Sequence, residues 1–499
     1  MDLVELYFEI VYPIFPLFHQ PSFIRRISRA EYSSDRALFS LTMAVCALVS
    51  ARVRDGAVFN PGWDTRGLKE PKPQVFYHEA VRRADTACAQ SDLNSLRVHA
   101  VLALAAIQDG KIRDMHAHFS RYHAINAIEG LHDEDNWPKH IGTIEVEERR
   151  RLFWSMYTLD VFTSIAWGGV IRSREGQSNV SYPTEVDDDM FDDTGFADTS
   201  IFSESLNVLP SQDSAHASGI SWLAGRNTVT DLYRVIEHSA IPSPARRGRA
   251  QRKMMIDDII QDKSALSQDV VRKRVMQMYA DLPQSLKETR PVQSKPRLDR
   301  FGFQAADIIA TVQLVRMVLL CDDSASILEK CQIANEVVSA FIAIPTAYHR
   351  AISVPLLFHL GVIGQMLSTT LEEPLSEQDY RSIRDVTFAM AQLLSTLEDL
   401  HASKGASQRL RNQIARIDEY MMSQRSSIGT QQRNLALTHA AAQAPLESSQ
   451  PLESAASGSA GMTETLLASP FQLPPDVVGD FSQIFDFGQI TQDWSLENH

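Results

Sequence analysis

Cysteine is scarce in this chain of 499 residues. The four cysteines, Cys46, Cys88, Cys321 and Cys331, lie far apart, and no CxxC pair occurs. A disulfide framework needs regularly spaced cysteines, and a structural zinc site usually needs CxxC-type pairs. We therefore expect buried, reduced thiols, which are typical of a cytosolic or nuclear protein.

Positive charge and long apolar runs are also in short supply. The formal net charge is −14, so any contact with DNA would require a local basic module. The uncharged run 37–51 is shorter than the roughly twenty residues that cross a bilayer. The run 351–371 is long enough but contains Pro355, His359 and Gln365. We interpret both runs as buried core helices and expect no contact with a membrane.

The usual signatures of catalysis and of cofactor binding are missing. No GxSxG elbow, phosphate-binding glycine loop or dinucleotide fingerprint occurs. His116, His118 and His123 form a local cluster, but His116 and His118 point to different faces of a helix. His116 and His123 share a face but lie two turns apart, too far for one ion. We therefore expect no catalytic residue, no metal site and no cofactor in this chain.

Helical periodicity dominates the chain from Asp2 to about Arg433. No run alternates at period two for long enough to predict a sheet, so the expected fold is all-α, a multi-helix bundle or solenoid. The polar stretch 192–219 is expected to be a long surface loop. The clearest expected helices are Leu38–Arg52, Val75–Gln90, Leu93–Gln108, Met115–Ala127, Arg149–Trp167, Ala305–Leu320, Ile327–Ile344 and Tyr380–Ser403.

The most informative stretch runs from Glu148 to Asp189. Arg149–Arg151 open a helix whose apolar residues recur every four positions from Phe153 to Ile165. A Gly-Gly pair ends this helix, because glycine readily adopts positive φ. An extended polar segment then leads through Pro183 to an acidic run.

This layout resembles the core of the middle homology region of fungal zinc-cluster transcription factors. In that family an Arg-rich helix start leads into (L/F)W(S/W)xYxLD, a Gly turn, an Arg-containing loop and PxEVDDD. The matching residues are Arg150, Arg151, Leu152, Phe153, Trp154, Tyr157, Leu159, Asp160, Pro183, Asp187, Asp188 and Asp189. The segment from Tyr7 to Phe23 also resembles the family's aromatic opening, and the resemblance covers residues 1 to about 430.

The resemblance implies a regulator of RNA polymerase II genes that is located in the nucleus and is not an enzyme. It implies control of a metabolic or secondary-metabolite gene set through coactivator or mediator-type proteins and a homodimer or heterodimer partner. The resemblance also implies that a small-molecule effector binds the protein. DNA would be reached indirectly or through a separate zinc-cluster module.

Within the motif we expect structural roles. Arg150 and Arg151 should pair with Glu147 or with the run Asp187–Asp189, which would tie the loop to the helix start. Tyr157 and Asp160 should make buried polar contacts. The candidate structural residues are Arg150, Arg151, Trp154, Tyr157, Asp160, Pro183, Asp187, Asp188 and Asp189.

The family's DNA-binding module uses six cysteines to hold two zinc ions, and this sequence offers no such set. Two explanations stay open. The gene model lacks an upstream exon, or the protein is a natural variant that works as an adaptor or negative regulator without binding DNA itself.

The C-terminal part changes composition twice. Residues 434–470, rich in Ala, Ser, Gln and Pro, are expected to be a flexible linker that follows the body 1–433. Residues 471–499 interleave aromatic and acidic side chains and contain no Lys or Arg. Carboxylate repulsion keeps such aromatics accessible to a coactivator groove, so we expect an activation segment. The alternative is a segment that docks back onto the helical body. The candidate activation residues are Phe481, Phe485, Phe487 and Trp494.

A basic cluster bounded by prolines suggests nuclear import, although the start of a solvated helix is an equal alternative. Its residues are Arg246, Arg247, Arg249, Arg252 and Lys253.

A remote alternative is a class I terpene or prenyl synthase. Asp188, Asp189 and Asp192 match DDxxD, a pattern that holds magnesium diphosphate. A second metal motif would need Glu four residues after Ser, whereas Glu329 follows Ser326 by three, with Asp322 before them.

Overall fold

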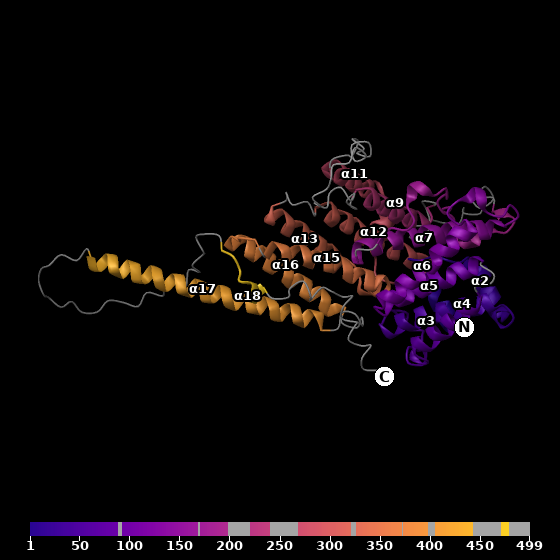
Figure 1. The fold of residues 1–499 in the computed structure, drawn as a ribbon, viewed down its shortest axis with the longest axis horizontal. Helices are drawn as coiled ribbons and strands as arrows, with labels where there is room; N and C mark the ends of the chain where they lie inside the picture. Colours follow the sequence, from indigo (N-terminus) through magenta and orange to yellow (C-terminus); the bar gives the residue numbers. More distant parts are fainter. Residues whose placement is uncertain are drawn as a thin grey trace, which may run out of the picture.

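The computed structural model describes residues 1–87, 92–167, 170–197, 220–239, 268–320, 326–371, 373–397, 405–442 and 471–478. Within this part of the chain the fold is all-α, as the helical periodicity predicted. Figure 1 shows a wide body of packed helices, from which one long C-terminal helix projects.

The N-terminal half is built around two helices that are buried along most of their length. The helices are α1 (Asp2–Ile10), α2 (Gln20–Ser28), α3 (Arg36–Arg54), α4 (Pro73–Ala87), α5 (Leu93–Gln108), α6 (Ile112–Glu129) and α7 (Thr143–Trp167). Helix α3 packs against α1, α4 and α5, and α5 packs against α6. Asp35 and Asp92 cap α3 and α5 by accepting hydrogen bonds from backbone amides in the first turn.

The second half follows α7. Its helices are α9 (Leu223–Ser239), α11 (Gln268–Asp281), α12 (Pro296–Leu320), α13 (Ile327–Ala343), α14 (Thr346–Ile352), α15 (Val354–Leu371), α16 (Glu377–Thr396), α17 (Ala406–Ala442) and α18 (Pro475–Val478). Helix α12 packs against α9 and α11, while α16 packs against α13 and α17. The buried apolar residues of both halves form one continuous core. Helix α17 continues past Arg433, where the body was expected to end, to Ala442.

Short elements connect the helices. Single 3₁₀ turns lie at Glu31–Ser33, Gly67–Lys69, Glu134–Asn136, Glu175–Gln177, Asp188–Met190 and Gln284–Leu286. Strands β1 (Phe191–Asp192) and β2 (Gly195–Phe196) form a small antiparallel hairpin. The expectation of a loop from residue 192 was therefore wrong for Asp192, Gly195 and Phe196, and residues 198–219 lie outside the described residues.

Two helices, α3 and α12, are long and apolar enough to cross a membrane by length and composition alone. Their apolar windows are 78% and 72% buried inside the protein, as in the core helices of a folded domain. The apolar run 351–371 is divided between α14 and α15 at Ser353, whose φ is 61°. The run 37–51 lies within α3 and is thus part of the protein core, and Leu357, Leu360, Ile363 and Leu367 of α15 are buried as well.

Two of the four cysteines lie in described segments. Cys46 on α3 and Cys331 on α13 are both buried free thiols, and burial raises the pKa of each to about 12. Both are therefore protonated and unreactive at neutral pH. Cys88 and Cys321 lie outside the described residues.

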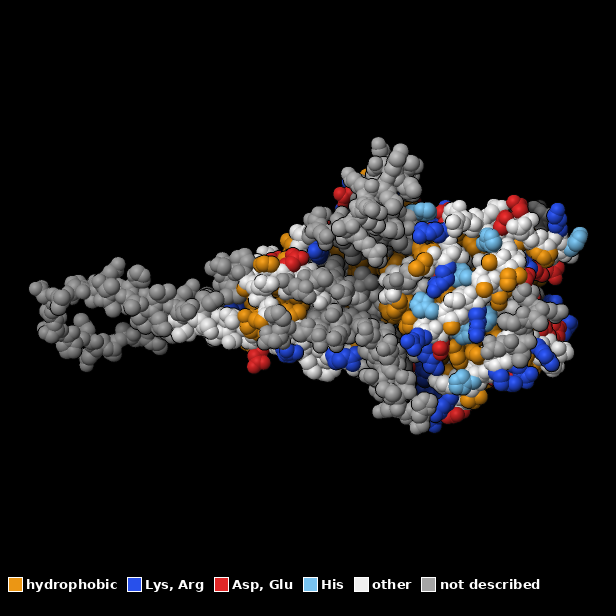
Figure 2. All heavy atoms as spheres, viewed as in Figure 1, with side chains coloured by type: hydrophobic (Ala, Val, Ile, Leu, Met, Phe, Trp, Pro, Cys, Tyr) orange, Lys and Arg blue, Asp and Glu red, His pale blue; other side chains and the backbone are white. Residues whose placement is uncertain are grey.

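The surface of the N-terminal half is mixed in charge. Figure 2 shows Lys, Arg and His side chains spread over the visible face, with hydrophobic and acidic side chains between them. On this face the described residues form no continuous basic patch of the kind that grips nucleic acid.

Candidate functional site

Helix α7 carries the motif and lies deep in the molecule. It packs against α5, α9 and strand β1, so almost every side chain from Leu152 to Thr163 is buried. A helix that is covered on all sides can be apolar all round, but its few polar groups then need partners. The polar side chains of α7 therefore decide which other segments the helix can bind.

Arg151 and Asp188 form a buried ion pair at the start of this helix. Arg151 Nη1 lies 2.6 Å from Asp188 Oδ1, and the two side chains are 0% and 5% exposed. The Tyr12 hydroxyl and the Gln20 amide donate to the other carboxylate oxygen at 2.5 and 2.7 Å. His19 Nε2 lies 2.7 Å from the Asp188 carbonyl oxygen. One carboxylate thus joins α7, the end of α1 and the start of α2, and we call these five residues the Asp188 junction.

The Asp188 junction keeps its carboxylate charged. Burial alone would raise the pKa of Asp188, but the Arg151 guanidinium and the bonds from Gln20 and Tyr12 hold it below its usual value. Burial and the neighbouring carboxylate raise the pKa of Tyr12 well above its usual value. The hydroxyl therefore stays protonated and donates to Asp188.

Arg150 fastens the loop that returns from the motif. It contacts Glu134 Oε1 at 2.9 Å and Glu147 Oε1 at 2.9 Å. Glu147 in turn accepts two bonds of 2.8 Å from the amide and hydroxyl of Thr184. The pairing of Arg150 with Glu147, and of Arg151 with the acidic run, agrees with the sequence-based expectation.

Two further hydrogen bonds hold residues 181–183 of this loop. Trp154 Nε1 donates to the carbonyl of Ser181 at 2.9 Å. The buried Pro183 accepts a bond of 3.1 Å at its carbonyl from the side chain of Asn227 on α9. The loop therefore lies fixed between α7 and α9.

Tyr157 and Asp160 are both buried, but they bind different partners and not each other. The Tyr157 hydroxyl donates to Glu237 on α9 at 2.6 Å, and burial together with Glu237 raises the pKa of Tyr157. Asp160 is 0% exposed and accepts bonds from the Arg172 amide (2.5 Å), the Arg172 guanidinium (2.9 Å) and the Ser173 amide (3.1 Å). Asp160 thus fixes the chain that follows the helix.

The histidine cluster of α6 meets this same loop. Arg172 Nη2 lies 3.1 Å from His116 Nδ1, and His123 Nε2 lies 3.8 Å from Asp160 Oδ2. Burial, with a smaller opposing effect of Asp160, lowers the pKa of His123 to about 4. His123 is therefore neutral at physiological pH.

The three aspartates of DDxxD point to separate partners. Asp188 is used inside the Asp188 junction, whereas Asp189 pairs with Arg297 on α12 at the surface. Asp192 accepts bonds from the amide and hydroxyl of Thr194. Asp187, which precedes them, accepts a bond of 2.8 Å from Ser221. Each of these carboxylates therefore contacts another residue of the protein. Ser326 caps α13 by accepting from the Glu329 amide, and Asp322 lies outside the described residues.

Cofactor binding by the described residues has no geometric support. Among them, no group of three or more His, Cys, Asp or Glu side chains is arranged to hold a metal ion. Cys46 and Cys331 lie on separate helices. Cys88 and Cys321 lie outside the described residues, so the structure gives no arrangement for the four cysteines as a set.

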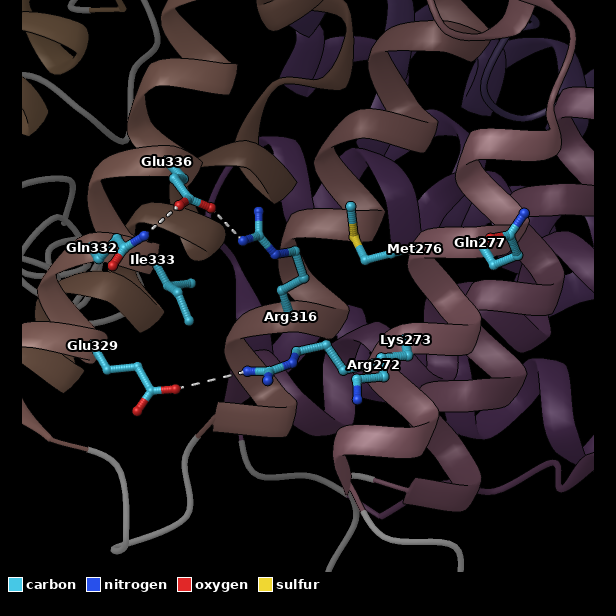
Figure 3. Close-up of a pocket in the computed structure, with 9 residues that line it drawn as sticks. All are labelled: Arg272, Lys273, Met276, Gln277, Arg316, Glu329, Gln332, Ile333 and Glu336. Atoms are coloured by element: carbon cyan, nitrogen blue, oxygen red, sulfur yellow. Dashed lines mark hydrogen bonds and ion pairs between the residues drawn. The ribbon is translucent and has the colours of Figure 1, made fainter.

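A separate open hollow of about 580 Å³ lies between α11, α12 and α13. Figure 3 shows Arg316 directed toward Glu336 and Arg272 directed toward Glu329. The first pair is 2.5 Å apart and the second 4.0 Å, and Lys273 also lines the hollow. Charges of both signs around a partly apolar floor suit a small polar molecule better than an apolar one.

Two sets of candidate residues fall in segments that the structure does not describe. The import cluster Arg246, Arg247, Arg249, Arg252 and Lys253 lies outside the described residues, as do the activation candidates Phe481, Phe485, Phe487 and Trp494. Their roles stay predictions.

The sequence did not reveal most partners of the motif. Tyr12, Gln20 and Glu237 carry no local signal of their own, because each lies far along the chain from the residue that it binds. His19 could have been suspected, since it is the histidine of the HxPxF opening.

The buried polar contacts of α7 hold together the N-terminal half of an all-α body. Residues 4–245 match the family described as "Fungal specific transcription factor domain". The matched part holds most of α1, the helices α2 to α9 and the whole Asp188 junction.

A curated relative supports the same family. The chain is similar, at 25% identity over 191 residues, to the "ABC-transporter-regulating transcription factor" of Aspergillus oryzae. The match covers 37% of this chain and only a fifth of the relative's length (20%). No solved structure matches the chain.

Proposed function

We propose that this protein regulates transcription of RNA polymerase II genes in the nucleus, with a helical body that controls an acidic-aromatic activation segment. The observation that carries the proposal is the family match over residues 4–245. The buried junction supports a structural role for the motif, because each of its charged groups is already bound within the protein. The sequence of the tail interleaves aromatic and acidic residues, a composition suited to coactivator grooves.

Control of a metabolic or secondary-metabolite gene set remains part of this proposal. The relative is named for the regulation of an ABC transporter, so transporter genes are a reasonable first set of targets to examine. DNA would be reached through a zinc-cluster module or a dimer partner that supplies one. A small polar effector would fit the hollow between α11, α12 and α13, where Lys273, Arg272 and Arg316 offer positive charge.

The test is to fuse residues 434–499, and separately the whole chain, to a heterologous DNA-binding domain and to measure reporter expression. We expect strong activity from the tail and weaker activity from the whole chain. Silence from both fusions would contradict an activator and favour the second candidate, a non-DNA-binding adaptor or negative regulator.

The aromatic residues of the tail should carry the activity. Replacing Phe481, Phe485, Phe487 and Trp494 with alanine should abolish reporter activity, because the anchors for a coactivator groove are lost. The matched control replaces four polar residues of the same segment, Ser482, Gln483, Thr491 and Gln492, with alanine and should keep the activity. Full activity in the aromatic variant would rule out the activation segment.

A further inference from the structure

The C-terminal segment returns to the helical body far from the family motif. Residues 471–478 lie along α16 and α17, and α18 runs beside α17 in Figure 1. Leu473 and Val478 are only 3% and 5% exposed. Such deep burial of two apolar side chains indicates that this segment binds the helical body at a defined position and is not in loose contact with it.

Backbone pairing holds the start of the segment. The Leu375 amide donates to the Phe471 carbonyl at 2.7 Å, and the Phe471 amide donates to the Leu375 carbonyl at 2.8 Å. The Phe471 ring also meets the Tyr380 ring of α16 edge-on, with centroids 6.4 Å apart. A reciprocal antiparallel pair with an adjacent side-chain contact is the way in which proteins bind extended peptides.

A single glutamine holds the other end. Gln413 of α17 is 6% exposed, and its Nε2 donates to the carbonyls of Val477 and Val478 at 2.8 and 2.5 Å. Its Oε1 accepts from Arg416 at 3.4 Å, which orients the amide. These carbonyls belong to the last turn of α18, so Gln413 caps the C-terminal end of that helix.

The sequence of the segment favours this bound form. Pro474 and Pro475 restrict the backbone before binding, and Pro475 begins α18, where a proline is well tolerated. Charge favours it as well. Helix α17 contains five arginines and two acidic residues, and the one charged residue of the segment 471–478 is the acidic Asp476.

We propose that the face formed by α16, α17 and Leu375 is a peptide-binding site that is occupied by the chain's own residues 471–478. The activation candidates begin at Phe481, directly after this segment, so occupancy of the site governs how freely a coactivator can reach them. The first part stands on the contacts above, whereas the effect on activation rests on the proposed function.

The test uses the full chain and two matched variants. Leu473→Asp places a charge at a buried position of the segment, while Met422→Asp places the same charge on α17 at a side chain that is 59% exposed. In hydrogen exchange, we expect the hydrogen-bonded amides of Phe471, Val477 and Val478 to be protected in the wild type and in Met422→Asp. They should exchange at least about tenfold faster in Leu473→Asp, with α3 to α7 unchanged. Equal exchange in all three proteins would overturn the peptide site.

A synthetic fluorescent peptide of residues 469–480 provides an independent measurement. It should bind the Leu473→Asp protein, whose site is vacated, and bind the wild type much more weakly because the site is already filled. Adding Gln413→Ala to Leu473→Asp should weaken peptide binding about tenfold. Failure of the peptide to bind the vacated protein would also overturn the site.

The reporter separates the two parts of the inference. Leu473→Asp in the tethered full chain should raise reporter activity above that of the wild type and of Met422→Asp. Unchanged activity, with an active isolated tail, would refute control by occupancy. An inactive isolated tail would instead refute the proposed activation function. Hydrogen exchange and peptide binding would then decide by themselves whether the peptide-binding site exists.

Discussion

Replacing Arg151 with methionine tests the energetic role of the Asp188 junction. Methionine keeps much of the side-chain volume but removes the cation, so the Asp188 carboxylate stays buried without its ion partner. Tyr12 and Gln20 would still donate to Oδ2, at 2.5 and 2.7 Å in the native protein. Only Oδ1 would lose its bond.

The expected loss in the free energy of unfolding is about 3–5 kcal/mol, the usual range when one partner of a buried ion pair is removed. The remaining bonds to Tyr12 and Gln20 place the value near the lower end. A neighbouring control exists on α12. Arg297 pairs with Asp189, but these side chains are 61% and 46% exposed, so Arg297→Met should cost no more than about 1 kcal/mol.

Urea unfolding of the wild type, Arg151→Met and Arg297→Met measures both losses. The comparison requires that the unfolding free energy depends on urea concentration with the same slope in all three proteins. The pH dependence adds a signed check. In the wild type the folded-state pKa of Asp188 lies below 3.8, so its stabilisation is present above that pH and is lost as the pH falls through the folded pKa. Without Arg151, burial raises the pKa, and protonation then relieves the buried charge.

The loss in unfolding free energy caused by Arg151→Met should therefore become smaller as the pH falls from neutral into the acidic range. Equal losses for Arg151→Met and Arg297→Met at pH 7 would refute the reasoning. A double variant, Arg151→Met with Asp188→Leu, should recover part of the loss. Recovery stays incomplete because Tyr12 and Gln20 then lack their acceptor.

Three further changes test other parts of the molecule. Asp160→Ala should destabilise the fold by about 2–4 kcal/mol, because it removes the acceptor of the Arg172 and Ser173 amides; a thermal melt at the wild-type temperature would contradict this. Tyr157→Phe should cost about 1–3 kcal/mol in urea unfolding, since Glu237 loses a bond of 2.6 Å in a buried site; a loss below about 0.5 kcal/mol would show that the bond is dispensable. Replacing the basic cluster with glutamine should move a fluorescent fusion of the full chain from the nucleus to the cytoplasm, and unchanged localisation would remove its import role. This cluster comprises Arg246, Arg247, Arg249, Arg252 and Lys253.

The helices were predictable because their apolar residues recur at helical spacing. Leu93–Gln108 was expected and observed with the same bounds. Helix α7 begins at Thr143 instead of Arg149, because its first turns are polar and acidic and leave no apolar pattern. Helix α12 likewise begins at Pro296, ahead of the expected Ala305. Apolar periodicity locates the apolar part of a helix and misses first turns rich in polar side chains, even where these are buried, as at Glu147 and Gln304.

The partners of the motif were harder to predict. Tyr12 and Asp188 are 176 positions apart, and Tyr157 and Glu237 are 80 apart. Charge indicates that a buried arginine needs a carboxylate, but it does not say which of many carboxylates will be near. The chain path decides that, and the path depends on the packing of α1, α2 and α9 around α7. The sequence offered docking of the tail onto the body only as an alternative, because a docked segment and a free one share the same composition; residues 471–478 follow that alternative.

The position of the Asp188 junction explains what changes in the motif would do. It binds α1, α2 and α7 to one carboxylate, and the adjacent Asp189 and Gln20 contact Arg297 and Arg300 of α12. Substitutions there should therefore lower the amount of folded protein and, through it, all activities together. The face on α16 and α17 lies outside residues 4–245 and away from this junction. Substitutions there should instead change activity at constant abundance, so the ratio of activity to protein level distinguishes the two regions.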